Sequence, residues 1–403
     1  MRSIKKSLRL QSMVNEHIAH GSLTNSKHPR SFVEGVYPTT AKKGSKCYLF
    51  DVDDNRYIDF ICALGTNLFG YGNHAILESV NSAMSSGGSV FSLSSDKELE
   101  LAERLKGTFP WLERMRFLKT GSEGCSAAVR IARAYTGKPV ILSEGYHGWN
   151  DGFVSLTEPA HGVFGDFSFE KYSEDADFNL VAAVIIEPVM LDFSAARIDW
   201  LNNLRNKCIK HGTLLIFDET ITAYRFKDGS VARATGIYPD LWIGGKALAG
   251  GLPISVVGGR KEVMESEYFI SSTWAGDRLA IEAAKTANNL IHDDKFRPNT
   301  LWSFGTEFLA KFNALSPHIK IDGYATRGSF VAKPIYKALF WQECVKAGVL
   351  FGPSWFYNIF LHEEMDNVLS ICKNVLDRIE DGKVSLEGSM PLSPFSQQVR
   401  EAL

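Results

Sequence analysis

Short apolar runs alternate with amphipathic stretches through the middle of the chain. The runs are rich in β-branched and apolar residues and predict strands, which we place at 115–119, 140–143, 181–186, 213–218, 241–244 and 254–258. Between them, apolar residues recur at three- and four-residue spacing, as in 122–135 and 198–211, which is typical of helices. Strands that alternate with helices favour a mainly parallel sheet with helices on both faces, so the chain is predicted to have an α/β fold.

The pattern changes on either side of this central part. Residues 47–59 predict two strands around the turn Asp53-Asp54-Asn55, and 277–291 predicts a long helix that is followed by shorter elements. A smaller second domain of α+β type is therefore expected after the large one. The expected limits are 1–45 for an N-terminal segment that joins the small domain, 46–285 for the large domain and 286–403 for the small C-terminal domain.

Composition and charge exclude several classes of protein. Apolar residues make up 45% and charged residues 22%, as in ordinary globular proteins, and the formal net charge of -2 argues against a nucleic-acid partner. No apolar run approaches the roughly 20 residues that a bilayer requires, so no membrane partner is expected. The six cysteines stand singly, without metal-ligand spacing, and predict reduced thiols, a cytoplasmic location and no metal.

One lysine has neighbours in the sequence that are unusual for a lysine. Lys246 lies among small and apolar residues in the segment 241–253, LWIGGKALAGGLP. Burial lowers the pKa of an ammonium group and so yields the neutral amine that condenses with a carbonyl. The alternative, a surface lysine in a glycine-rich loop, stays open from this segment alone.

One predicted strand ends with two acidic residues, Asp218 and Glu219. The carboxyl ends of such strands are where α/β proteins build their sites, and an aspartate against a pyridine nitrogen keeps that nitrogen protonated. A carboxylate here equally suits the cap of the next helix or a Mg²⁺ ion, so both interpretations remain.

Two further loops carry candidate chemistry. Residues 119–125, KTGSEGC, join a strand to a helix, and the free N–H groups and the Ser122 hydroxyl there favour a phosphate, although simple capping by serine is the alternative. Residues 145–151, GYHGWND, offer Tyr146 as an aromatic face for a planar ring, beside His147, although local core packing is the alternative. Neither GxSxG nor HExxH occurs, which leaves hydrolase chemistry unsupported.

Taken in order, seven segments of the chain resemble the class III aminotransferases of the fold-type I pyridoxal-phosphate superfamily, and within them most closely the glutamate-1-semialdehyde 2,1-aminomutases. The segments are YLFDVDDNRYIDF (48–60), KTGSEGCSAAVRIARAYTG (119–137), GYHGWND (145–151), IIEPV (185–189), IFDETITAYRF (216–226), GGKALAGGLP (244–253) and GVLFGPSWF (348–356). The resemblance covers most of the chain. It implies pyridoxal 5'-phosphate as cofactor and the α/β fold of that superfamily.

The resemblance also implies roles for single residues. Lys246 corresponds to the Schiff-base lysine and Asp218 to the partner of the pyridine nitrogen, the two catalytic residues. The expected cofactor contacts are Gly121, Ser122 and the Glu123 backbone at the phosphate, Tyr146 stacked on the ring with His147 beside it, and Thr273 reaching the phosphate from a partner subunit. A homodimer with shared active sites follows, with Arg225 supporting the site through an ion pair.

Three departures from the aminomutase pattern concern the substrate. The threonine is followed by Gly276-Asp277-Arg278 instead of Gly-Asn-Pro, and the segment that holds the substrate carboxylate is replaced by residues 28–32, where Arg30 is the candidate. The stretch 151–185, which holds a gating loop in the aminomutase, is short. We therefore favour an aminotransferase with a small-molecule amino donor and a carbonyl acceptor, a carbonyl sugar or another non-standard compound. The aminomutase itself and a non-catalytic module that binds the cofactor remain the alternatives.

Overall fold

The computed structural model describes residues 2–154, 163–164 and 167–394 and divides the chain into two compact units. The first unit combines the chain up to Asn73 with the chain from Leu301 onward, and the second comprises His74–Thr300. The small unit is therefore built from segments at both ends of the sequence. The domain limits expected from the sequence, 46–285 and 286–403, stay a prediction beside these two units.

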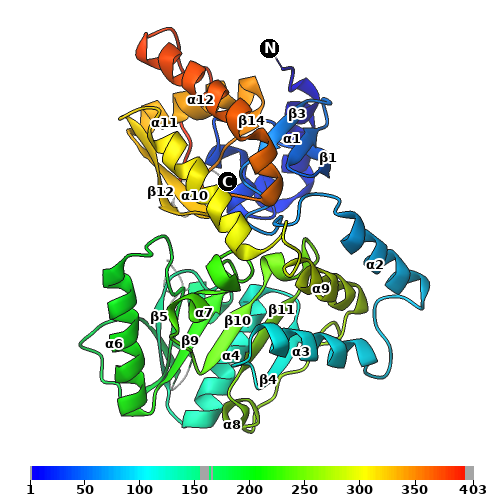
Figure 1. Ribbon diagram of the computed structural model, residues 1–403, viewed down its shortest axis with the longest axis vertical. Helices are drawn as coiled ribbons and strands as arrows, with labels where there is room; N and C mark the ends of the chain where they lie inside the picture. The colour runs from blue at the N-terminus through cyan, green and yellow to red at the C-terminus, as the bar shows by residue number, and fades with distance from the viewer. Residues whose placement is uncertain (1, 155–162, 165–166, 395–403) are drawn as a thin grey trace. The chain divides into compact units, whose positions relative to one another are not determined.

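The second unit contains a mixed sheet of eight described strands (Figure 1). In sheet order these are β4 (Arg114–Leu118), β11 (Ser255–Gly259), β10 (Leu241–Gly244), β9 (Leu214–Glu219), β8 (Val181–Ile186), β5 (Val140–Glu144), β7 (Phe167–Lys171) and β6 (Val163–Phe164). Strands β10, β9, β8, β5 and β7 run parallel, whereas β11 is antiparallel to both of its neighbours. All six strands predicted from the sequence are confirmed, and so is the α/β class.

The core of this sheet follows from continuous apolar runs. Every residue of β8 and β9 is buried, which is expected for parallel strands that are covered on both faces. Helix α4 (Gly121–Thr136) packs on β8, β9, β10 and β11 through a face that includes Cys125, Ala128 and Ala132. The helix ends at Gly137, whose φ of 69° is the left-handed conformation that glycine adopts most readily.

The other helices of this unit are α2 (His74–Ser85), α3 (Asp96–Thr108), α5 (Asp151–Val154), α6 (Ala195–His211), α7 (Val231–Thr235), α8 (Lys261–Met264) and α9 (Arg278–Leu290). Helix α9 contacts both α2 and α3 and confirms the long helix predicted at 277–291. Short 3₁₀ turns η4 (Lys227–Gly229) and η5 (Lys246–Ala249) lie in the connections. In the short stretch 151–185, residues 155–162 and 165–166 lie outside the described residues, so the expected absence of a gating loop stays a prediction.

The first unit contains two small sheets. One pairs β1 (Ala41–Ser45), β2 (Tyr48–Asp51), β3 (Arg56–Asp59) and β14 (Val349–Leu350), and the other pairs β12 (Ile319–Tyr324), β13 (Arg327–Ala332) and β15 (Trp355–Phe356). The predicted hairpin is the antiparallel β2–β3 pair. Its helices are α1 (Lys5–His17), α10 (Pro298–Asn313, mostly in this unit), α11 (Pro334–Ala347) and α12 (Met365–Glu380), with short turns η1 (Ala19–Gly21), η2 (Asn25–Lys27), η3 (Pro29–Ser31) and η6 (Ile359–Glu364). Phe308 stacks on Trp355 at a centroid distance of 5.7 Å in its core.

All six cysteines are buried and none forms a disulfide, as expected for reduced structural thiols. Within residues 2–154, 163–164 and 167–394, no helix combines the length and the apolar character needed to cross a bilayer.

Candidate active site

Four connections meet at one edge of the large sheet. Strands β4, β5, β9 and β10 end there, because β11 is antiparallel to both β4 and β10 and the remaining pairs are parallel. Their carboxyl ends lead into Lys119–Ser122, Gly145–His147, Asp218 and Lys246. The carboxyl edge is where open α/β sheets bind their ligands, so the sequence-predicted residues of this unit gather where a site is expected.

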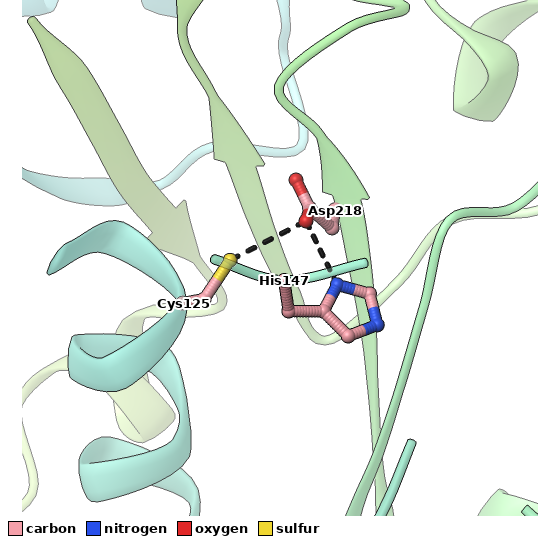
Figure 2. Close-up of side chains that lie close together, drawn as sticks. All are labelled: Cys125, His147 and Asp218. Atoms are coloured by element: carbon pink, nitrogen blue, oxygen red, sulfur yellow. Dashed lines mark hydrogen bonds and ion pairs between the residues drawn. The ribbon is translucent and has the colours of Figure 1, made fainter. Parts of the chain in front are cut away.

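Asp218 forms the centre of a buried cluster at the end of β9 (Figure 2). Its Oδ2 accepts a hydrogen bond from His147 Nδ1 at 2.8 Å and from Cys125 Sγ at 3.4 Å. Its Oδ1 accepts from the backbone N–H of Thr220 at 3.1 Å. Two donors therefore already occupy Oδ2, and Oδ1 keeps the capacity to accept one more.

The cluster keeps Asp218 ionised. Burial alone raises the pKa of this carboxyl, but the hydrogen bond and charge of His147, together with Thr220, more than offset burial and hold the pKa below its usual value. Burial raises the pKa of the Cys125 thiol well above its usual value, so that the thiol keeps its proton and remains a donor. Asp218 is thus a buried anion at neutral pH.

His147 lies between two acceptors. Its Nδ1 faces the Asp218 carboxylate, and its Nε2 lies 3.1 Å from the carbonyl oxygen of Glu144. Neutral imidazole carries one N–H, so both hydrogen bonds form together only when the ring is protonated. The ring also meets Phe153 edge-on, at a centroid distance of 5.6 Å. Because Cys125, His147 and Asp218 satisfy one another, their close grouping has an explanation without a metal ion.

Lys246 lies two residues after the end of β10, at the start of η5. In the ladder Gly244 lies opposite Glu219 and Ile243 opposite Asp218, so the lysine leaves the sheet beside the strand that carries the aspartate. Its φ of 46° is in the left-handed region, which is sparsely populated for residues with a side chain. Lys246 itself is partly buried, and the following Ala247, Leu248 and Ala249 are fully buried. A strained backbone held by a buried turn is a common feature of functional sites.

The start of α4 offers open backbone donors. Thr120 caps the helix: its Oγ1 accepts from the Glu123 N–H at 3.2 Å, while Glu123 Oε2 accepts from the N–H groups of Lys119 at 2.7 Å and Thr120 at 3.2 Å. The Glu123 N–H is therefore already occupied. In the described part of the chain, the N–H groups of Gly121 and Ser122 meet no acceptor, which leaves them available to an anion at the positive end of the helix.

The loop after β5 is fixed against this helix start. Gly148 has a φ of 97°, and a Cβ at this position would lie 2.1 Å from Ser122 Oγ, so the close approach requires glycine. Asn150 Nδ2 donates to the Ser122 carbonyl at 3.2 Å and to Ser126 Oγ at 2.8 Å. Tyr146 is half-exposed, and the pKa of its hydroxyl is raised by burial and by nearby Cys125 and Asp218. The ring therefore lies near the Asp218 cluster.

The remaining predicted residues lie elsewhere. Thr273 is exposed in a turn before α9. Arg30 belongs to the first unit, where its Nε lies 4.0 Å from Glu34 Oε2. Arg225 is fully buried. Asp277, one of the departures from the aminomutase pattern, forms an ion pair with Lys119 and accepts from Ser89 Oγ at 2.5 Å, which ties the turn of Thr273 to the strand end before α4.

Sequence reasoning missed Cys125 and Thr220. Cys125 lies one helical turn after Gly121, which puts it on the face of α4 that packs on the sheet, and this spacing was the available signal. Thr220 lies two residues after Asp218. Its side chain contacts the loops of both Gly121 and Gly245, a meeting of segments that no local pattern indicates.

The arrangement fits pyridoxal 5'-phosphate. Lys246 supplies an amine for the aldehyde, ionised Asp218 suits the protonated ring nitrogen, and the open N–H groups of Gly121 and Ser122 suit the phosphate. The hydroxyl of Thr220 is also buried without a hydrogen-bond partner among the described residues, as expected of a polar atom that awaits a ligand.

Comparison with known proteins agrees with this fit. The family model "Aminotransferase class-III" matches residues 32–353. The chain is 37% identical over 294 residues to the glutamate-1-semialdehyde 2,1-aminomutase of Symbiobacterium thermophilum, covering 65% of this chain and 68% of that protein. It is 28% identical over 400 residues to the enzyme of the same name from Syntrophobacter fumaroxidans, covering 86% and 92%. Among solved structures, the pyridoxal-phosphate form of the FumI protein of Sphingopyxis sp. MTA144 superposes with a TM-score of 0.85 at 22% identity, covering 96% and 99%, which shows the fold.

Proposed function

The chain belongs to the class-III aminotransferase family and is therefore a pyridoxal-phosphate-dependent enzyme that moves amino groups, so we propose that Lys246 and Asp218 are its catalytic residues. One observation carries this proposal. Lys246 and the ionised, buried Asp218 lie at the carboxyl ends of two neighbouring parallel strands, β10 and β9. Lys246 lies two residues after Gly244, the last residue of β10, and Asp218 lies at the end of β9.

The cofactor, when bound, supplies an electron-withdrawing ring that stabilises negative charge on the substrate carbon beside the amino group. The Asp218 carboxylate would hold a proton on the ring nitrogen and thereby maintain that capacity. His147 fixes the carboxylate through Nδ1, with its own orientation set by the Glu144 carbonyl. Lys246 Nζ would be the group that takes the proton from the substrate carbon, acting as a general base.

The phosphate is held, in this proposal, by the N–H groups of Gly121 and Ser122 and by the Ser122 hydroxyl. Their availability at the start of a sixteen-residue helix supports this assignment, as does the favourable helix dipole. Glu123 contributes through its capping of Thr120, since its own N–H is engaged. Tyr146 is the proposed stacking ring, and its position near Asp218 supports that role.

The proposed assembly is a homodimer in which Thr273 reaches the phosphate of the partner's site. Support comes from the exposure of Thr273 and of large apolar side chains on the same unit: Phe269 is 77% exposed, Trp274 52% and Trp149 71%. Exposed aromatic residues of this size are typical of surfaces that associate. The cytoplasm is the inferred location because all six cysteines are buried thiols.

The favoured reaction is transfer from a separate amino donor to a carbonyl acceptor, with carbonyl sugars among the acceptors to be tested. The departures at Asp277 and in residues 28–32 support it over the aminomutase reaction. The second candidate is intramolecular transfer on glutamate-1-semialdehyde, which is favoured by the names of the two curated relatives. Arg30 is the proposed ligand of a substrate carboxylate in either case.

A spectroscopic screen of the purified yellow protein separates these reactions. An aminotransferase loses its visible absorbance when a single amino donor is added, and regains it when a carbonyl acceptor follows. An aminomutase converts glutamate-1-semialdehyde completely with no co-substrate and shows no such two-stage cycle with other donors. If no amine changes the spectrum, the protein is a non-catalytic module and the proposal is wrong.

A further inference from the structure

Thr220 contacts three of the segments that form the candidate site. Its backbone N–H donates to Asp218 Oδ1 at 3.1 Å. A Cβ at Gly121 would lie 2.8 Å from Thr220 Cγ2, and a Cβ at Gly245 would lie 3.1 Å from the same methyl group. The side chain therefore fills the space between the start of α4 and the residue before Lys246, which explains why both neighbours are glycine.

Among the described residues, the hydroxyl of Thr220 has no hydrogen-bond partner. It lies near enough to the Asp218 carboxylate to help lower the pKa of that acid, yet no described oxygen or nitrogen meets it at hydrogen-bond geometry. Its Oγ1 is buried from solvent. A buried hydroxyl that stays unsatisfied is costly, so native proteins rarely keep one without a ligand or ordered water to receive it.

The hydroxyl of Thr220 lies beside the start of α4. Oγ1 lies 3.0 Å from the position of a Cβ on Gly121, whereas the contacts with Gly245 are made by Cγ2 and, at 3.8 Å, by Cβ. Oγ1 therefore faces the start of α4, whereas Cγ2 faces both the start of α4 and the segment of Lys246. A hydroxyl there adds a fourth donor to the two backbone N–H groups and the Ser122 hydroxyl.

We propose that Thr220 is a cofactor-binding residue whose hydroxyl donates a hydrogen bond to the phosphate of pyridoxal 5'-phosphate. The inference rests on the proposed function, in which Gly121 and Ser122 hold that phosphate. A phosphate oxygen would give the buried hydroxyl the acceptor that it lacks among the described residues, and Thr220 links the phosphate end of the site to Asp218 through its own backbone N–H.

The test measures how tightly two ligands, pyridoxal 5'-phosphate and pyridoxal, bind to the apoprotein of the wild type and of Thr220→Val. Valine keeps the shape and removes the donor. We expect the variant to bind pyridoxal 5'-phosphate at least tenfold more weakly, about the effect of losing one hydrogen bond to a charged group, and to bind pyridoxal, which lacks the phosphate, as the wild type does. Equal weakening for both ligands would assign the hydroxyl to Asp218 and the ring, and unchanged affinity for both would remove it from the site. Either result overturns the proposal.

Thermal unfolding provides a readout that is independent of activity. The Thr220→Val apoprotein should be as stable as wild type or more so, because an unsatisfied buried hydroxyl has been removed, while the stabilisation on adding the cofactor should shrink. If the role of Thr220 is purely structural, the substitution shifts the unfolding temperatures of the apo and holo forms equally. That result would contradict the proposal.

Two variants serve as controls. Thr220→Ser keeps the hydroxyl and should bind the cofactor within about threefold of wild type, even if the lost methyl group lowers stability. Thr136→Val removes a hydroxyl that donates to the Ala132 carbonyl at 2.8 Å at the far end of α4, and it should leave both affinities unchanged. If the wild type itself fails to bind pyridoxal 5'-phosphate, the proposed function fails; if only the difference between the variants is missing, the role of Thr220 fails alone.

Discussion

His147 and Asp218 form a buried hydrogen-bonded pair, with 2.8 Å between Nδ1 and Oδ2, and the other ring nitrogen of His147 lies 3.1 Å from the Glu144 carbonyl oxygen. Both hydrogen bonds form together only when the ring is protonated, and the hydrogen bond and charge of His147 lower the pKa of Asp218. The loop after β5 and the end of β9 are thereby locked together at the point where the ring nitrogen of the cofactor is expected.

Replacing His147 tests this relationship. His147→Leu removes both donors and leaves a buried carboxylate without its charged partner, so the pKa of Asp218 should rise. We expect the rate of the first half of the amino transfer to fall about tenfold to a hundredfold, the effect of losing a charge-assisted hydrogen bond, with cofactor still bound. His147→Asn, which keeps one donor, should lie between wild type and His147→Leu. Stopped-flow absorbance measures these rates, and equal rates in all three proteins would exclude the pair from the reaction.

The lowered pKa of Asp218 predicts a definite pH dependence of stability. A group whose pKa is lower in the folded state contributes stability above its unfolded value of about 3.9, and this contribution is lost as the pH falls through the folded value. Asp218→Asn should therefore lower the free energy of unfolding by roughly 1–3 kcal/mol at pH 7, and the difference from wild type should narrow only below about pH 4.

Urea unfolding between pH 3 and pH 7 measures this difference. Asp199→Asn, on the exposed face of α6, is the matched control and should follow the wild type at every pH. A difference between wild type and Asp218→Asn that already narrows between pH 7 and pH 5 would contradict a lowered pKa.

The contact between Gly121 and Thr220 predicts a pair of coupled variants. Gly121→Ala places its methyl group 2.8 Å from Thr220 Cγ2, so the helix start must move and cofactor affinity should fall about tenfold or more. Adding Thr220→Ser removes that methyl group and should recover part of the affinity. Equilibrium binding of the cofactor to the single and double variants gives the coupling, and strictly additive effects would show that the two residues do not touch.

Much of the fold could be predicted because its signals are local. Six of the eight described strands of the large sheet, together with α9, follow from apolar runs and helical spacing, and β8 and β10 have the predicted bounds. The short β6 and β7 were not predicted. The pairing of β14 with β3 joins residues about 290 positions apart, and the compact unit built from both ends of the chain depends on such contacts, which periodicity does not encode.

The candidate site divides in the same way. Lys246 and Asp218 stood out because a charged residue at the end of an apolar strand is visible in the sequence. Cys125 and Thr220 did not, because a thiol on a helix and a threonine after a strand are ordinary until the fold brings them beside Asp218 and Gly121.

The ion pair of Lys119 with Asp277 should support the turn that carries Thr273. Both side chains are largely buried, and although burial opposes it, Lys119 and Ser89 hold the pKa of Asp277 below its usual value. Asp277→Asn should therefore cost about 1–3 kcal/mol in stability and weaken the proposed dimer. Asp54→Asn, which breaks the exposed pair with Lys42, should change neither. Unfolding and sedimentation of both variants test this; a stable, fully dimeric Asp277→Asn protein would exclude such a role.

The most direct measurement is the attachment point of the cofactor. The yellow protein is reduced with borohydride, which makes the bond between cofactor and lysine permanent, then digested and analysed by mass spectrometry. We predict a phosphopyridoxyl group on the peptide containing Lys246, and neither the group nor the visible absorbance in Lys246→Ala. A modified lysine elsewhere, or an unmodified Lys246 peptide from yellow wild-type protein, would contradict the assignment of Lys246.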